Sequence, residues 1–427
     1  MLEDVPVVCP GCYASLVVLE GAWACAGCGR AGAPLGPVVT LYAEPEAEHA
    51  AIEVGATRHL RRATDTAEAV GRQLTSALAV SRSRLEQLGE GLQRHVGGLG
   101  QRWQLAGIAL RSDGGPTRHD PGRIETQTLR DWAWPTDAGW EDENRQAHGQ
   151  LMDHVGGELG RVLVLGAGAS RLAYDLHRDA RHTVALDLSP FPLLVAASIW
   201  SGQTIEMWEF PPVPRTAPSR RWEAAAPAPA PGLVAVAADG LDPPFEAGSF
   251  DTVVTPWFID QIPRDLPRLL QVLRFLLVPG GRWLNLGPLI YPGDSAMAGR
   301  HGLAEVVTLA EAAGFSVDRP SSVRVQYLCS PASTQGRVEV VHAFGARRDD
   351  IPLEARPAPP WLHRPDLPVP RFGAKPDHPV KAMVADAIDG RRAVRDIAEH
   401  LVRTRGMPPE DAAAGVQLTI ADLYARR

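Results

Sequence analysis

Four of the five cysteines form two pairs near the N-terminus, and their spacing suits a metal ion. The pairs are Cys9-Pro-Gly-Cys12 and Cys25-Ala-Gly-Cys28, and the segment 15–23 between them is predicted to form a hairpin. Four thiolates at this spacing predict a structural zinc ribbon over residues 1–40, with disulfide pairing as the alternative. So short a segment cannot build its own core, so zinc binding would supply its folding energy. The sequence leaves open whether the ribbon binds a partner or braces the next domain.

A second group of residues, between 160 and 188, has the order strand, glycine-rich turn, helix, strand, acid. An apolar run ends at Leu165, Gly166 and Gly168 form the turn, and a second strand ends on Asp187. Such a turn lets the backbone approach a nucleotide-like ligand, and the acid can accept hydrogen bonds from ribose hydroxyls. A tight turn without a ligand is the alternative, because Ser170 occupies the third glycine position.

The elements that must position these residues are predicted from hydrophobic periodicity. Residues 44–122 are predicted to be a helical region that packs on the core, with a loop over 111–122, and helical character returns over 124–156. Residues 211–231 form a Pro/Ala-rich insertion, for which we expect a mobile loop. Further strands are predicted at 162–165, 183–186, 233–237, 250–255, 282–286, near Phe315 and at 338–344, with helices at 189–200, 265–277 and 303–313. This order predicts an α/β fold with seven mostly parallel strands.

Composition narrows the class of protein. The chain has 427 residues, a formal net charge of -7, 45% hydrophobic and 22% charged residues, which fits a soluble globular protein of two or three domains. The negative charge argues against non-specific nucleic-acid binding and leaves open a local basic patch. No apolar run reaches the ~20 residues that span a bilayer, and the N-terminus lacks a secretory signal. We therefore expect a cytoplasmic protein without membrane contact, where cysteines bind metal rather than form disulfides.

Three features together resemble class I S-adenosylmethionine-dependent methyltransferases. They are the acid at the end of the second strand, Asp239 after the third strand and Pro279-Gly-Gly before the fifth. A dehydrogenase would share the opening turn, but the Phe250-Asp strand and the Leu-Val-Pro-Gly-Gly-Arg turn favour a methyltransferase. The acid that this class usually has two residues before the first glycine is replaced by Val164.

Longer motifs resemble one branch, the carnosine N-methyltransferase family, over roughly residues 124–346. Residues 165–173 are similar to its Pro-Gly-Ala-Gly-Leu-Gly-Arg-Leu-Ala motif, and Phe258-Ile-Asp260 matches its Phe-Ile-Asp. The run from Pro279 to Tyr291 resembles its Pro-Gly-Gly-Ile-Trp-Ile-Asn-Leu-Gly-Pro-Leu-Leu-Tyr. Gln127 and Arg130-Asp-Trp match its Gln-x-x-Arg-Asp-Trp.

The resemblance implies a role for each matching residue. Gln127 and Arg130 would hold the methionine end of S-adenosylmethionine, since a guanidinium suits its carboxylate. The remaining cofactor contacts would be the turn glycines Gly166 and Gly168, the ribose-binding Asp187, Asp239 and Gly240 at the adenine, and Thr252. Asp260 would face the acceptor nitrogen as the catalytic carboxylate, or alternatively cap a helix near Arg264.

Two departures from the family pattern fall in its acceptor pocket. Pro292 stands where the family has His after Tyr, and Arg337-Val-Glu-Val340 replaces a Tyr-rich late strand. The resemblance therefore implies methyl transfer to a different acceptor, a peptide or an amino-acid-derived small molecule. Tyr291, Tyr327 and His301 are expected near the pocket, without assigned roles.

After a Pro-rich linker (349–376), residues 377–427 resemble small winged-helix modules related to pyrroloquinoline-quinone synthesis protein D. The motif is Asp389-Gly-Arg-Arg-Ala-Val-Arg-Asp-Ile397. Such modules bind leader peptides by strand addition, so the resemblance implies a possible peptide or protein partner. The whole chain is thus interpreted as a zinc-ribbon methyltransferase with its catalytic domain at 123–347. The alternative is a peptide-binding scaffold protein of a biosynthetic cluster whose methyltransferase fold has degenerated.

Overall fold

The computed structural model describes the chain except for residues 1, 3, 4, 111–116, 118, 124, 138, 139, 141, 263–265, 294–296, 352–355, 363–365, 372–375, 407, 426 and 427, and the side chains of residues 80, 123, 360, 410 and 411. Arg264, weighed above as a neighbour of Asp260, and the first residue of the helix expected at 265–277 lie outside the described residues.

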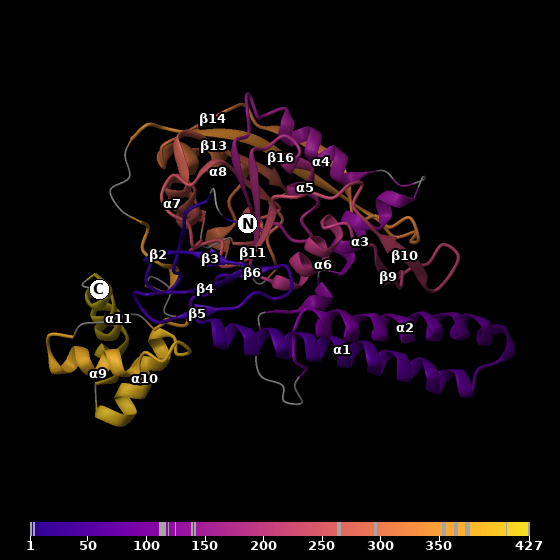
Figure 1. Ribbon diagram of the computed structural model, residues 1–427, viewed down its shortest axis with the longest axis horizontal. Coiled ribbons are helices and arrows are strands. Elements are labelled where there is room, and N and C mark those ends of the chain that lie inside the picture. The colour runs from indigo at the N-terminus through magenta and orange to yellow at the C-terminus, as the bar shows by residue number, and fades with distance from the viewer. Residues whose placement is uncertain are drawn as a thin grey trace.

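A mixed sheet forms the centre of the molecule (Figure 1) and contains nine strands among the described residues. Its order is β14-β16-β13-β12-β7-β8-β11-β6, and β15 pairs beside β16. The strands are β6 (Val39–Thr40), β7 (Arg161–Leu165), β8 (His182–Asp187), β11 (Leu233–Ala237), β12 (Phe250–Pro256), β13 (Leu277–Gly287), β14 (Phe315–Val317), β15 (Ser321–Tyr327) and β16 (Arg337–Arg348). β16 runs antiparallel to β13, whereas β6, β11, β8, β7, β12 and β13 are parallel. The predicted α/β fold with a mixed, mostly parallel sheet of the methyltransferase type is confirmed.

Strand order reverses direction between β7 and β12. From β7 the chain proceeds outward to β8 and then β11, and it returns to add β12 on the other side of β7 and β13 beyond it. Such a reversal opens a crevice at the carboxyl ends of the central strands, because the connections on either side leave in opposite directions. The glycine turn after β7 and the acid that ends β8 therefore belong to one edge of the sheet.

Helices cover the two faces of the sheet and divide the core into two layers. One face, with Val162, Val164 and Ala185, packs against α3 (Glu125–Trp132), α4 (Glu143–Met152), α5 (Arg171–His177) and α6 (Pro190–Trp200). The opposite face, with Leu163 and Leu165, packs against α7 (Leu266–Leu276) and α8 (Leu303–Ala312). Because strand side chains alternate between faces, each buried apolar run supplies both layers.

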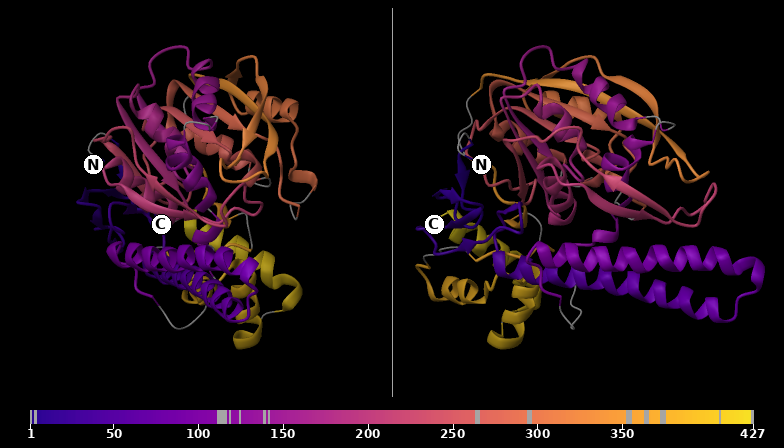
Figure 2. Two further views of the ribbon diagram at one scale, coloured as in Figure 1. Left: turned by 90° about the vertical axis from the view of Figure 1, so that its right-hand side faces the viewer. Right: turned by 45° about the vertical axis from the view of Figure 1, so that its right-hand side comes forward.

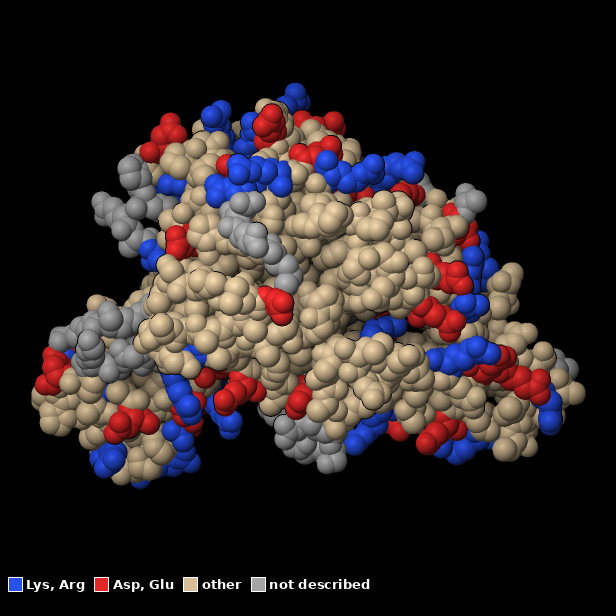
Figure 3. Space-filling view, in the orientation of Figure 1, with Lys and Arg blue, Asp and Glu red and all other residues tan. Residues whose placement is uncertain are grey.

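The expected helical region is a hairpin of two long helices, α1 (Pro45–Thr75) and α2 (Ala79–Leu105). It projects beyond the body of the molecule (Figures 1 and 2), so only its base packs on the core, through residues such as Ile52, Leu99 and Trp103. The expectation that the leucines of the whole region pack on the core is wrong for the outer half, where Leu78 is 79% exposed. Acidic and basic side chains are interspersed along the hairpin (Figure 3), as on a solvated helix surface.

The N-terminal segment packs on the α7/α8 face of the sheet. It contains β1 (Val7–Val8), β2 (Ser15–Leu16), β3 (Val18–Leu19), β4 (Ala22–Ala24) and β5 (Ala31–Gly32). β3 and β4 form the predicted hairpin, with Gly21 at a φ of 83° in its turn. The segment then enters the main sheet, because β6 pairs parallel with β11.

The Pro/Ala-rich insertion is not a loop throughout. β10 (Arg220–Ala224) pairs antiparallel with β9 (Ile205–Glu209). Trp222 and Trp134 are both buried, and both donate their indole N–H to the carboxylate of Glu209, at 2.8 and 3.1 Å. The mobile loop expected for 211–231 is therefore wrong for residues 220–224, which a buried polar contact ties to the core.

The C-terminal segment forms three helices, α9 (Pro379–Ala387), α10 (Val394–Arg405) and α11 (Pro409–Ala425), around a small core of their own. Trp361 and Val369, from the segment expected to be a linker, belong to that core. None of the described helices is both long and apolar enough to cross a membrane.

Candidate active site

A cavity of about 710 Å³ opens at the carboxyl ends of the central strands. Its size falls in the range of small-molecule sites, ~300–1,000 Å³. Eight of the nine residues expected to bind cofactor or acceptor line it: Gln127, Arg130, Gly166, Gly168, Asp187, Asp239, Gly240 and Asp260. The structure therefore brings together residues spread over 134 positions of the chain, as the crevice at the strand reversal predicts.

The exception is Thr252, in the middle of β12. Its side chain is 1% exposed and its hydroxyl donates a hydrogen bond of 2.8 Å to the carbonyl oxygen of Leu159. The described lining of the cavity does not include it. The side chain of Thr252 therefore contacts the backbone before β7 rather than the cavity.

The glycine turn and Asp187 form one hydrogen-bonded unit. One carboxylate oxygen of Asp187 accepts from the backbone N–H of Gly168 at 2.9 Å, and the other accepts from Ser189 at 2.9 Å. Burial raises the pKa of this carboxyl, and the backbone N–H groups oppose that rise. Each carboxylate oxygen has further lone pairs, so the acid can accept ligand hydroxyls while it stays fastened to the turn.

Two glycines in the cavity wall make room for an aromatic ring. A Cβ on Gly166, whose φ is 69°, would stand 2.5 Å from the ring of Phe258, and one on Gly240 would stand 3.2 Å from it. Phe258 thus packs between the turn after β7 and the loop after β11. Asp239 in that loop accepts from the backbone N–H of Leu241 at 2.9 Å, which fixes its carboxylate at the cavity edge.

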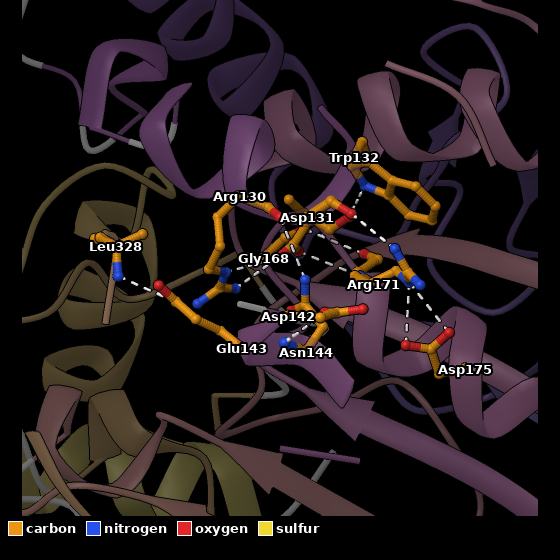
Figure 4. Close-up of polar contacts among 12 residues, drawn as sticks. Arg130, Asp131, Trp132, Asp142, Glu143, Asn144, Gly168, Arg171, Asp175 and Leu328 are labelled. Atoms are coloured by element: carbon orange, nitrogen blue, oxygen red, sulfur yellow. Dashed lines mark hydrogen bonds and ion pairs between the residues drawn. The ribbon is translucent and has the colours of Figure 1, made fainter. Parts of the chain in front are cut away.

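Arg130 enters the cavity from α3 and is held by a chain of charges (Figure 4). Asp131 accepts from the Arg130 guanidinium at 2.7 Å and from the backbone N–H of Arg171 at 3.3 Å, and Arg171 in turn contacts Asp175 at 3.0 Å. Burial works against the Arg130 charge, but Asp131 and neighbouring groups outweigh it and raise the pKa above its ordinary value. The residue is therefore a fixed cation whose planar donors suit a carboxylate ligand.

A stacked aromatic pair closes the side of the cavity next to Arg130. The rings of Trp257 and Tyr327 lie 5.6 Å apart at 21°, and the Arg130 guanidinium lies 5.8 and 5.7 Å from their centres. Trp257 has a φ of 47°, which is rare for a side chain of this size. Such strain at the end of a strand is characteristic of functional sites, where surrounding contacts hold it in place.

Two carboxylates face the remaining part of the cavity. Asp260, in a short 3-10 helix (Ile259–Gln261), is 3% exposed, and its Oδ1 has no hydrogen-bond partner among the described residues. Burial, with a smaller contribution from the charge of Glu339, raises its pKa to about 6. Glu339 is 5% exposed and is held by Arg337 at 2.6 Å and by the indole of Trp257 at 3.3 Å.

Sequence reasoning did not assign several of these groups to the site. Trp257, Phe258 and Asp131 lie in or beside the family motifs but received no role, and Arg337 and Glu339 stood out only as departures from the family. Of the three residues expected near the pocket, Tyr327 lines it, whereas Tyr291 and His301 are absent from its described lining. The sequence does contain one signal for the acceptor side. Glu339 is a charged residue between β-branched residues of a predicted strand, which indicates a functional position.

The four N-terminal cysteines also come together, and their sulfurs lie within 4.8 Å of one another. Cys9 and Cys28 are 3.6 Å apart and Cys12 and Cys25 are 3.4 Å apart, near the roughly 3.8 Å edge of a tetrahedron with Zn–S bonds of ~2.3 Å. Tyr13 and Gly29, each four residues after the first cysteine of a pair, have φ of 59° and 74° and return their N–H to that cysteine's carbonyl. The two pairs therefore have matching turns, and the donor set fits a structural zinc ion.

The fold and the cavity define the chain as an α/β protein of the class I methyltransferase type. Residues 232–349, from the start of β11 to the end of β16, match the model of a protein family described as Carnosine N-methyltransferase. That segment includes Asp239, Asp260 and Glu339. It begins after α3 and the glycine turn, so the match does not cover them. A search of curated proteins found no significant match.

Solved structures with a similar fold include several methyltransferases. N-methyltransferase NodS from Bradyrhizobium japonicum is 14% identical over 53% of this chain and 98% of its own, with a TM-score of 0.34. A putative methyltransferase from Bacillus halodurans is 13% identical over 48% and 99%, with a TM-score of 0.34. Phosphoethanolamine N-methyltransferase 2 from Haemonchus contortus is 16% identical over 48% and 52%, with a TM-score of 0.32. Likenesses at this level carry no argument about the reaction.

Proposed function

We propose that this protein is an S-adenosylmethionine-dependent methyltransferase that methylates a nitrogen atom of a peptide or an amino-acid-derived small molecule. The observation that carries the proposal is a single cavity lined by two chemically different sets of groups. The first set contains the Arg130 cation and the fastened Asp187 carboxylate, and the second contains the buried carboxylates of Asp260 and Glu339.

The first set of groups fits the donor. Arg130 and Gln127 suit an amino-acid carboxylate, Asp187 suits vicinal hydroxyls, and the loop at Asp239 and Gly240 borders an aromatic surface on Phe258. S-adenosylmethionine, when bound, supplies a methyl group on a sulfonium that needs no further activation. The protein must therefore align two reactants and exclude water, which fits a site built from packed aromatic rings and fixed charges.

The second set of groups fits a basic acceptor. The Oδ1 atom of Asp260 is buried without a hydrogen-bond partner among the described residues, which is costly unless a ligand satisfies it, and a cationic or N–H-bearing nitrogen would do so. Asp260 would orient that nitrogen and accept the proton it loses as the new N–C bond forms. Glu339 adds negative charge at the place where the resemblance implied tyrosines, which supports an acceptor different from carnosine.

A peptide acceptor is supported by the surroundings of the cavity. A second hollow, of about 510 Å³, lies between the ribbon, α1 and the C-terminal segment, and it shares Asp239 and Leu367 with the active-site cavity. Leu367 belongs to the segment that packs with the C-terminal helices. The two cavities meet at Asp239 and Leu367, so a peptide bound by that module would lie next to the active-site cavity.

The test is mass spectrometry of candidate amine, imidazole and peptide acceptors incubated with the protein and isotope-labelled methyl donor. We expect transfer of one labelled methyl group to nitrogen, and loss of transfer in Asp260→Asn with donor binding intact. Donor binding without transfer to any acceptor class would favour the scaffold alternative, and absence of donor binding would remove the enzyme proposal altogether.

A further inference from the structure

Three side chains from three different helices converge at the base of the α1–α2 hairpin. His59 of α1 and His95 of α2 both direct Nε2 at the same carboxylate oxygen of Glu125, the first residue of α3, at 3.2 and 3.5 Å. One donor atom from each residue lies within 4.8 Å of the other two. The methyltransferase site described above uses none of the three.

The two distances also match those between ligands of one metal ion. Charge-assisted N–H···O contacts are usually ~2.7–2.9 Å long, shorter than either distance here. Nitrogen and oxygen ligands ~2.0–2.1 Å from a tetrahedral zinc ion stand roughly 3.3 Å apart. Two imidazole nitrogens that share one carboxylate oxygen at 3.2 and 3.5 Å reproduce that edge.

Aromatic rings pack beside the cluster, and two buried polar atoms near it lack a hydrogen-bond partner. The His59 ring lies 6.2 Å from the ring of Trp103, and the His95 ring lies 5.5 Å from that of Phe210. His59 Nδ1 and Trp103 Nε1 are both buried, and neither has a hydrogen-bond partner among the described residues. Buried polar atoms without a partner are rare in folded proteins, and bound water beside the cluster would satisfy them.

We propose that His59, His95 and Glu125 bind a divalent transition-metal ion, zinc, with two nitrogens and one carboxylate oxygen. Imidazole and carboxylate ligands suit zinc, and three protein ligands leave a fourth position for water. The ion would join α1 and α2 to the N-terminus of α3, which carries Gln127 and Arg130 into the active-site cavity. Its role is therefore to position α3, and the proposal does not depend on methyl transfer.

A neighbouring cation modulates the proposed site. Arg102 acts electrostatically on both Glu125 and His95, and a positive charge there opposes a second one. Arg102→Met, which retains most of the apolar stem, should therefore bind zinc at this site more tightly than the wild-type protein does. A purely hydrogen-bonded cluster predicts no such gain.

The first experiment is elemental analysis of the full-length protein purified without chelator. We expect two zinc ions per chain, and one in Glu125→Gln and in His95→Gln, whereas the control His400→Ala on α10 keeps two. One zinc ion in the wild-type protein, unchanged in Glu125→Gln, would overturn the proposal.

Replacement of zinc by cobalt(II) provides a second readout. The spectrum of the wild-type protein is informative by itself, so this readout does not require the variants to fold. In the wild-type protein we expect the thiolate charge-transfer band of the ribbon together with weaker visible bands of a nitrogen- and oxygen-ligated ion, and the second set should disappear in Glu125→Gln. A spectrum with thiolate-bound cobalt alone would mean that the three residues form a metal-free hydrogen-bonded cluster.

Discussion

The hydroxyl of Tyr13 donates a hydrogen bond of 2.7 Å to the carboxylate of Asp242, three residues after Asp239. Tyr13 lies directly after Cys12, so the four-cysteine cluster is fastened to the loop that forms one edge of the cavity. The backbone strengthens the same connection, because Val8 donates to Pro244 at 2.9 Å and Glu246 donates to Pro6 at 3.1 Å. The contacts thus favour a ribbon that braces the catalytic domain.

Loss of the ribbon metal should weaken donor binding as well as stability. In Cys25→Ser we expect loss of one zinc ion, a lower Tm and a several-fold weaker affinity for S-adenosylmethionine, because the loop at Asp239 loses its support. Elemental analysis, thermal unfolding and calorimetry measure the three effects. The matched control is Cys329→Ser, since Cys329 is the fifth cysteine and lies outside the cluster. An unchanged donor affinity in Cys25→Ser without its ribbon zinc would show that the ribbon does not support the active site.

Asp260 should lose its proton as the pH rises through about 6. We expect the enzyme to become more active and the folded state to become less stable over this range. The pKa of Asp260 is raised to about 6 by burial, so the folded state favours the protonated form. The stabilising effect of this protonation is fully present below the unfolded pKa, about 4, and is lost as the pH rises through 6. The carboxylate needed for proton acceptance forms over the same range.

Asp260→Asn tests both consequences. At pH 8 the variant should be more stable than the wild-type protein by about 2–3 kcal/mol, and at pH 4 equally stable, as measured by denaturant unfolding. Its methyl transfer should be low at every pH, without the rise near pH 6. Glu339→Gln is the companion variant, because removal of that charge should move the rise to lower pH. A wild-type activity that is flat between pH 5 and 8 would contradict the assignment.

The central strands could be predicted because each is a continuous apolar run bounded by turn residues, as at β7 and β11. The additional strands were missed for identifiable reasons. β6 has only two residues, so its pairing with β11 leaves no periodic signal. β10 lies in a Pro/Ala-rich segment whose composition indicates a loop. The strand is stabilised by a contact between Trp222 and Glu209 that the sequence alone does not show.

The donor side of the site could be predicted because its residues lie in local motifs. The acceptor side could not, since it depends on which face of β16 meets the cavity. There the usual pattern is inverted: Glu339 is buried, while Val338 and Val340 are 64% and 45% exposed. An assumption that apolar side chains point inward therefore assigns the wrong face of the strand to the core. The buried charge is explained by two partners, Arg337 two residues earlier and Trp257 far away in sequence.

Glu209 should be essential for the stability of the β9–β10 hairpin. Glu209→Leu leaves the indole N–H groups of Trp134 and Trp222 buried without an acceptor, which should cost about 2–5 kcal/mol in the free energy of unfolding. Glu209→Gln keeps an acceptor oxygen and should cost much less. Denaturant unfolding with tryptophan fluorescence measures both. Equal stability of the two variants would mean that the shared carboxylate does not hold the hairpin to the core.

The most direct test of the donor site is calorimetric titration of the full-length protein and its Asp187→Ala variant with S-adenosylmethionine. We expect the wild-type protein to bind one equivalent and the variant to bind at least tenfold more weakly, because it loses a charged acceptor for the ribose and the anchor of Gly168. Asp179→Ala, an exposed acid after α5, should bind like the wild-type protein. No binding by the wild-type protein, or equal binding by Asp187→Ala, would contradict the donor site proposed here.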